Sequence, residues 1–180
     1  MTSDKVRMKK ETPTTDGQII ARLKIATELG EFADGYSSKG LARLHFPSER
    51  NRTARGNDAA SPQIIRWHEQ TTAALNAVLT GKSSDELPPL DFSAGTDFQR
   101  TVWHAMRKIR TGETRSFGEI ARAIGNPKAV RAVGGACGAN PIPVLVPCHR
   151  VLAAHQKIGG FSGGLDWKRK LLAREGVKPD

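Results

Sequence analysis

Residues 81–95, GKSSDELPPLDFSAG, divide the chain into two parts with different hydrophobic patterns. Small and polar residues around two adjacent prolines are typical of a stiff linker. Before it, apolar and polar side chains alternate weakly over residues 19–47, and glycine-containing turns interrupt the alternation, which predicts short antiparallel strands. Over residues 62–79 the apolar side chains have helical spacing. After it, helical spacing dominates. We therefore expect an α+β fold, with a small N-terminal antiparallel sheet plus a helix and a mostly helical C-terminal domain.

The same breaks in pattern define the expected segments of the chain. Residues 1–17 are charged, Thr-rich and without periodicity, which predicts a flexible tail. Residues 18–90 are expected to form an N-terminal α/β bracing domain that includes the linker, and residues 91–180 a C-terminal domain. Residues 48–62 carry no apolar side chain beyond alanine and predict a mobile loop.

Basic residues are concentrated in the second half. The chain has 28 Lys and Arg against 18 Asp and Glu, a net charge of +10, of which +2 belongs to residues 1–90 and +8 to residues 91–180. A basic half predicts a polyanionic partner, and nucleic acid is the usual one. The alternative is a solvated basic surface that keeps the protein in solution.

The cysteines and the N-terminus bear on the cellular compartment. Cys137 and Cys148 are too few for a disulfide framework, although a single bridge is compatible with the count. The first residues are polar throughout, unlike a signal peptide, and no apolar run approaches membrane-spanning length. We expect a cytoplasmic protein with reduced thiols and no membrane association.

The second half contains two short predicted helices that follow a longer one over residues 97–109. Ser116 and Glu119 form a capping-box pattern at the start of the first short helix. A Gly-Asn turn follows, and Pro127 suits the first turn of the next helix, residues 127–139. Together they resemble a helix-turn-helix. The small residues of the second helix permit close approach either to a DNA groove or to another helix.

Cys148 is the candidate nucleophile. It follows the apolar segment PVLV, which prolines bound on both sides and which we predict to be a short strand or a buried extended segment. A thiol must lose its proton to become a good nucleophile. His149 is adjacent, but neighbouring side chains of an extended chain point apart, so contact through a water is one option. Glu113, Glu119 and Glu175 are candidates to orient that histidine.

Inert packing is the competing interpretation of these residues. A cysteine after an apolar strand is usually part of the core. Cys137 has no adjacent histidine, and we expect it only to pack. The histidines show no metal-ligand spacing, so no metal site is predicted.

Three long segments carry a resemblance to a known family: GTDFQRTVWHAMRKIRTGETRSFGEIA, NPIPVLVPCHRV and GGFSGGLDWKRKLLAREG. They resemble the catalytic domain of the O6-alkylguanine-DNA alkyltransferases over residues 95–176. The segment IATELGEFADGYSSKGLARLHF is more loosely similar to the N-terminal domain of the same family.

The resemblance implies a role for each matching residue. Cys148 would accept the alkyl group, His149 would act through a water as its base, and Glu175 would orient His149. Asn140 would brace the turn before the active-site segment. The implied DNA contacts are the finger Arg131, together with Ala129, Ala132, Gly135 and Phe117. The implied base pocket consists of Val151, Phe161, Ser162 and Lys168.

The resemblance also implies the reaction and its partner. The protein would transfer a methyl or small alkyl group irreversibly from O6-alkylguanine, and from O4-alkylthymine, to its own cysteine, once per molecule and without a cofactor. Double-stranded DNA would be bound through the minor groove with the damaged base flipped out. A monomer is expected, associated with the nucleoid when bound to DNA. The zinc site of some relatives needs paired N-terminal cysteines, which this chain lacks.

Two residues depart from the family pattern, and three other interpretations compete with it. Phe117 and Phe161 stand where the family usually has tyrosine. A non-catalytic sensor of alkylated bases would carry Trp in place of Cys148. A helix-turn-helix regulator would explain the basic half but not PCHR or GGFSGG. A cysteine hydrolase would require turnover.

Overall fold

The computed structural model describes residues 17–48 and 60–180. The expected tail, apart from its last residue, and most of the expected loop at 48–62 lie outside the described residues.

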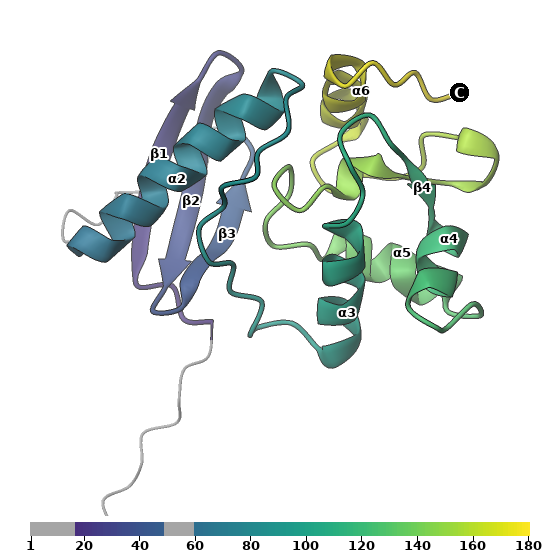
Figure 1. Cartoon of the computed structure of the whole chain (residues 1–180), viewed down its shortest axis with the longest axis horizontal. Coiled ribbons are helices and arrows are strands. Elements are labelled where there is room, and N and C mark those ends of the chain that lie inside the picture. The colour runs from purple at the N-terminus through teal and green to yellow at the C-terminus, as the bar shows by residue number, and fades with distance from the viewer. Residues whose placement is uncertain (1–16, 49–59) are drawn as a thin grey trace, which may run out of the picture.

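A three-stranded antiparallel sheet and one helix make up the N-terminal part (Figure 1). The strands are β1 (Ala21–Thr27), β2 (Gly30–Ser37) and β3 (Gly40–His45), paired in that order. Helix α2 (Pro62–Leu79) lies across the sheet and begins at Ser61, whose side chain accepts a hydrogen bond from the Ile64 amide. These elements have the types and order expected from the sequence.

The predicted linker also extends the edge of the sheet. The Leu41 amide donates to the Pro89 carbonyl and the Asp91 amide to the Leu41 carbonyl, both at 2.8 Å. Gly40 permits this approach, because a Cβ there would lie 2.1 Å from the Pro89 oxygen. The linker is therefore held against β3 where it enters the C-terminal part.

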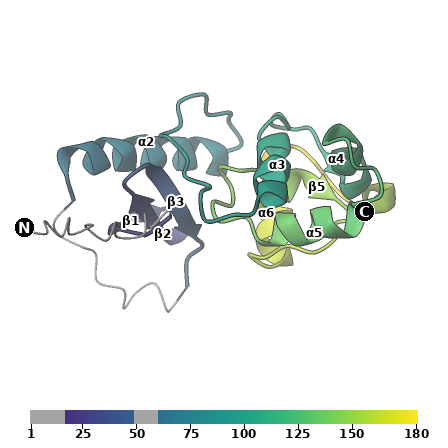
Figure 2. The ribbon, with the colours of Figure 1, turned by 90° about the horizontal axis from the view of Figure 1, so that it is seen from below.

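The C-terminal part is mostly helical and lies beside the sheet (Figure 2). Its helices are α3 (Asp97–Met106), α4 (Phe117–Ala123), α5 (Val130–Gly138) and α6 (Leu165–Arg174). Two short strands, β4 (Arg115–Ser116) and β5 (Val151–Leu152), pair in parallel, and the short 3-10 turns are η1 (Cys148–Arg150) and η2 (Ala154–Gln156). Together with the N-terminal sheet, these elements confirm the predicted α+β class.

Two predicted helix boundaries are wrong. Helix α3 ends at Met106 rather than Ile109, and the released Ile109 carbonyl accepts a hydrogen bond from Arg150 Nη1 at 2.7 Å. Pro127 lies outside α5, which begins at Val130. The Ala129 amide bonds to the Asn126 carbonyl at 3.0 Å, so the connection from α4 is a turn that includes the proline. Local periodicity cannot reveal such tertiary and turn bonds.

Candidate active site

The segment before Cys148 is a tight turn, not the predicted strand or extended segment. The Val146 amide donates to the Ile142 carbonyl at 2.9 Å, and Val144 has a positive φ of 74°. Asn140 holds both ends of this turn: its Nδ2 donates to the Val146 carbonyl at 2.8 Å, and its Oδ1 accepts from the Ile142 amide at 3.0 Å. These bonds support a left-handed conformation that a β-branched residue rarely adopts.

Cys148 begins η1, so the PCHR segment is curved rather than extended as expected. The cysteine is 5% exposed and lies at a pocket of about 300 Å³. The pocket is lined by Phe117, Gly134, Cys137, Gly138, Cys148, Gly160, Phe161 and Ser162. Its volume is at the lower end of ordinary small-ligand pockets. A larger cavity of about 560 Å³ is bordered by Pro147 and Arg150 but does not include the Cys148 thiol.

The Cys148 side chain is protonated at neutral pH. Burial raises the pKa of this thiol to about 11, although the Asn140 side chain and the positive charge of Lys168 act in the opposite direction. Lys168 is itself fully buried on α6 and donates from Nζ to the Val151 carbonyl at 2.7 Å and to the Gly160 carbonyl at 3.2 Å. Burial lowers the pKa of Lys168 to about 8. A base must therefore remove the Cys148 proton before the sulfur can attack.

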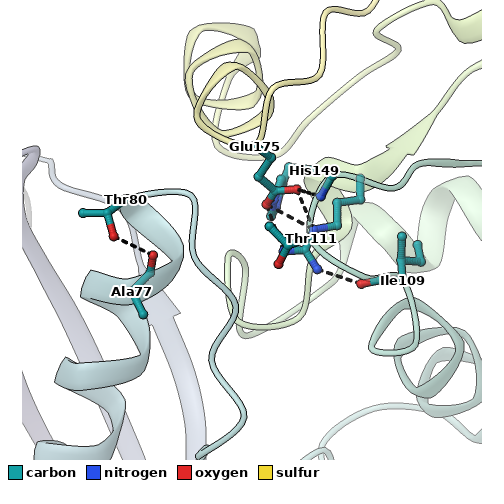
Figure 3. A network of polar contacts seen from close by, with 8 residues as sticks. Ala77, Thr80, Ile109, Thr111, His149 and Glu175 are labelled. Carbon is teal, nitrogen blue, oxygen red and sulfur yellow. Dashed lines mark hydrogen bonds and ion pairs between the residues drawn. The ribbon is translucent and has the colours of Figure 1, made fainter.

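His149 is oriented by a carboxylate from the end of α6. Its Nε2 lies 2.9 Å from Glu175 Oε1, and the two side chains are 0% and 1% exposed (Figure 3). Burial lowers the pKa of His149, against the effect of Glu175, so the ring is neutral at pH 7. An ionised carboxylate can only accept a hydrogen bond, so Nε2 carries the ring hydrogen and donates a hydrogen bond to Glu175, which leaves Nδ1 as the unprotonated, proton-accepting nitrogen. Nδ1 is buried and has no hydrogen-bond partner among the described residues.

Arg150 completes the network around Glu175. Its Nη2 lies 2.9 Å from Glu175 Oε1 and 3.1 Å from Thr111 Oγ1, and the Gly112 amide donates to Glu175 Oε2 at 3.0 Å. Figure 3 shows Thr111 and Ile109 beside His149 and Glu175. Burial would raise the pKa of Glu175, but the hydrogen bonds from His149, Arg150 and Gly112 lower it to about 2. The carboxylate is thus ionised and fixed.

Helix α5 presents a face of small residues beside the pocket. Arg131, Ala132, Gly135 and Gly138 are exposed, while Val133 and Ala136 face the core. Gly134, Cys137 and Gly138 line the pocket, so its wall and the exposed face belong to the same helix. Because these side chains are short, the backbone of α5 can approach a docked molecule closely.

Comparison with known proteins identifies the family. Residues 97–177 match the family model described as the DNA-binding domain of 6-O-methylguanine DNA methyltransferase. The methylated-DNA–protein-cysteine methyltransferase of Mycolicibacterium paratuberculosis is 49% identical over 119 residues, which cover 63% of this chain and 72% of the relative. The chain belongs to the methylated-DNA–protein-cysteine methyltransferase family. The protein of that name from Methanosarcina mazei is 41% identical over 140 residues, 76% of this chain and 85% of that one.

Solved structures agree with this assignment to the methyltransferase family. The structure of Mycobacterium tuberculosis OGT in complex with DNA has a TM-score of 0.72 and 39% sequence identity to this chain, covering 86% of this chain and 91% of that one. The structure of the O6-methylguanine methyltransferase from the same organism has a TM-score of 0.69 at 39% identity and covers 87% and 93%. The family resemblance stated from the sequence is confirmed.

The site residues predicted from the methyltransferase resemblance fall into three groups. Phe117, Phe161 and Ser162 line the pocket with Cys148. A second group supports the pocket from the core and consists of Asn140, His149, Val151, Lys168 and Glu175. A third group belongs to α5 and consists of Ala129 at its N-cap and the exposed Arg131, Ala132 and Gly135.

Several residues of the methyltransferase site had no assigned role in the sequence. Arg150 anchors Glu175, and Gly134, Gly138 and Gly160 shape the pocket. Cys137 was expected only to pack. Its Sγ lies 3.5 Å from Met106 Sδ in the core, but the residue also lines the pocket. The four-residue spacing of Gly134 and Gly138 is a signal that could have placed both on one helix face.

Metal binding and membrane insertion were not expected for this methyltransferase. Within residues 17–48 and 60–180, no group of three or more His, Cys, Asp or Glu side chains is arranged to hold a metal ion. No helix in that part of the chain is long and apolar enough to cross a membrane.

Proposed function

We propose that this methyltransferase repairs DNA by transferring an alkyl group from O6-alkylguanine to Cys148. The observation that supports it most is the buried thiol in the lining of a small pocket, followed in the chain by a histidine held by an ionised carboxylate. O4-alkylthymine is the second substrate that we propose. The protein acts as a monomer in the cytoplasm, associated with the nucleoid when bound to DNA, and needs neither a cofactor nor a metal.

The chemical step follows from the protonation states. His149 Nδ1 takes the Cys148 proton through a bridging water, and the nearby Lys168 ammonium stabilises the thiolate. The sulfur forms a bond to the alkyl carbon while the bond between that carbon and the guanine oxygen breaks. The electron pair of the broken bond goes to the guanine oxygen. The departing guanine takes up one proton, which balances the proton that His149 removed from Cys148. The resulting thioether has no good leaving group, so each molecule reacts once.

DNA docking is assigned to the exposed face of α5. A base inside a duplex cannot reach Cys148, and extruding it costs roughly a few kcal/mol. We propose that α5 enters the minor groove, where Ala129, Ala132 and Gly135 allow close approach and Arg131 fills the space of the extruded base. Phe117, Phe161, Ser162 and the backbone carbonyls of Cys148 and Val151 then surround the base in the pocket.

Mass spectrometry of the intact protein tests the proposed function. After incubation with an O6-methylguanine duplex, the protein should gain one methyl group, and peptide analysis should place it on Cys148. The gain should stop at one group per molecule. A methyl group on another residue, or repeated turnover, would refute the proposal.

Replacing Arg131 with alanine should separate base extrusion from chemistry. The Arg131→Ala variant should repair a lesion in a duplex more slowly than wild type, because nothing fills the vacated stack. The loss should be smaller for the same lesion in a single strand, where little extrusion is needed. Single-turnover rates on both substrates measure the difference, and equal losses would exclude the finger role.

Restoring a tyrosine at Phe117 should speed the reaction. Phe117 begins α4 and lines the pocket, but it cannot donate to the guanine as negative charge develops. A hydrogen bond to a charged group contributes about 1.5–3 kcal/mol, or about tenfold or more in rate. Rapid-quench measurements on one methylated duplex should show faster transfer by Phe117→Tyr at similar DNA affinity. An unchanged rate would mean that another group protonates the leaving base.

A further inference from the structure

A second cavity of about 320 Å³ adjoins the pocket at Cys148 and shares Gly138 and Ser162 with it. It runs between β3, the end of α5 and the glycine-rich loop before α6. Its lining residues are Arg43, Leu44, His45, Phe46, Gly138, Ala139, Asn140, Pro141, Pro143, Ser162 and Gly163. We call this cavity the β3 groove. One of its walls therefore comes from the N-terminal sheet.

Strand β3 is held against the C-terminal part by a backbone bond. The Leu44 amide donates to the Pro141 carbonyl at 2.9 Å, and β3 is the strand nearest to the C-terminal helices (Figure 1). Side chains alternate along a strand, so Leu44 faces the core while Arg43 and His45 are exposed. The cationic side chain of Arg43 and the polar side chain of His45 are thus held at the groove by the hydrogen-bonded backbone of β3.

Among the described residues, the lining of this groove carries positive charge and no acidic side chain. None of its lining residues is acidic, and Arg43 makes no hydrogen bond or ion pair with the described residues. The carboxylate of Asp91, which shares a neighbouring cavity with Arg43, accepts hydrogen bonds from Ser37 and Ser93 instead. Burial lowers the pKa of His45, and the positive charges of Arg43 and Arg22 lower it further.

The position of the groove relative to α5 indicates what it binds. Arg131 lies near the start of α5, and the groove lies at its other end, beyond Gly138. Seven residues of helix lead from Arg131 to Gly138, a distance of about 10 Å along the helix axis. This is about three base steps along a DNA strand. Gly134, Cys137 and Gly138, which line the pocket at Cys148, follow Arg131 along α5 and lead to the end of the helix at the groove.

We propose that the β3 groove binds the phosphate backbone of the damaged strand, with Arg43 pairing one phosphate and His45 donating to it. The N-terminal sheet then contributes directly to DNA binding, and the strand is held on both sides of the extruded nucleotide. This inference rests on the proposed function for the docking of DNA on α5.

Salt-dependent binding of an undamaged duplex tests this contact. Each phosphate contact contributes about 0.9 to the slope of log affinity against log salt. Arg43→Gln should therefore lower that slope by about 0.9. The ratio of its Kd to the wild-type Kd should shrink by about 3.5-fold between 50 and 200 mM salt. Arg66→Gln is the matched control, because Arg66 is an exposed arginine of α2 and does not line the groove.

Two further measurements keep the outcome decisive. Methyl transfer from the free base O6-methylguanine, which has no phosphate, should proceed at the wild-type rate in Arg43→Gln, and Arg43→Lys should keep the wild-type salt slope. An unchanged slope in Arg43→Gln, or the same loss in Arg66→Gln, would overturn the groove assignment. If the wild-type protein reacted with neither the free base nor methylated DNA, the proposed function itself would fail.

Discussion

Replacing Cys148 with serine should abolish methyl transfer and leave lesion binding intact. Serine keeps the size of the side chain, but its hydroxyl is a far weaker nucleophile than a thiolate at neutral pH. The pocket and the α5 face are not altered by the change. Incubation with a radiolabelled methylated duplex should transfer no label to Cys148→Ser, while a gel-shift assay should detect binding to the damaged duplex.

The second cysteine provides the control for this experiment. Cys137→Ser should transfer the methyl group, because Cys137 has no adjacent base and burial raises its pKa to about 12. Label on the Cys148→Ser protein, or loss of transfer in Cys137→Ser alone, would show that Cys148 is not the sole acceptor. A rate reduced without being abolished in Cys137→Ser would reflect its place in the pocket wall.

Changing Glu175 to glutamine should reduce the rate of transfer by about 10²–10⁴-fold, the usual contribution of general base catalysis. The glutamine amide can donate to His149 Nε2, which would move the ring proton to Nδ1 and remove the proton-accepting site. Because Glu175 acts through His149, it is a positioning residue. The pH profile distinguishes this role from simple unfolding, since a rise in rate toward high pH, where Cys148 ionises unaided, should partly rescue the variant.

Glu175→Ala should also destabilise the fold. Removing one partner of a buried ion pair costs about 3–5 kcal/mol, because the other charge is left without compensation. In the wild type, the pKa of Glu175 is lowered from 4.5 to about 2, so this stabilisation is present above pH 4.5 and is lost as pH falls toward 2. Urea unfolding of wild type and Glu175→Ala between pH 7 and pH 3 measures both effects. A difference in stability that stays constant with pH would contradict the assignment.

The sequence alone determined the family, the α+β class and most helices. The signals for these features are local: Ser116 and Glu119 form the predicted capping box at α4, and α2 covers the expected residues 62–79. Caps and hydrophobic periods extend over a few residues, so they can be recognised without knowing the tertiary structure. Long matching segments around Cys148 likewise pointed to the family and its nucleophile.

Tertiary contacts decided how the site is assembled. The residue pattern left three glutamates as candidates to orient His149, and the family resemblance pointed to Glu175. In the structure Glu119 caps α4, Glu113 pairs with Arg115, and Glu175, 26 residues away from His149, contacts it. An apolar run between prolines is compatible with a strand or a turn. The turn forms because the Asn140 side chain bonds to both of its ends.

The position of the N-terminal sheet also depended on the tertiary structure. Arg43 alternates with buried residues as any exposed strand residue does, and its sequence neighbours do not indicate a partner. The bond between Leu44 and Pro141, nearly a hundred residues apart, and the ring contacts of Phe32 and Phe46 with Trp167 bring it to the groove beside the pocket. The sequence determined which reactive side chains this protein carries and which helices they lie near, because both depend on residue type and on patterns over a few residues. Their arrangement depended on long-range backbone pairing, which leaves no local signal.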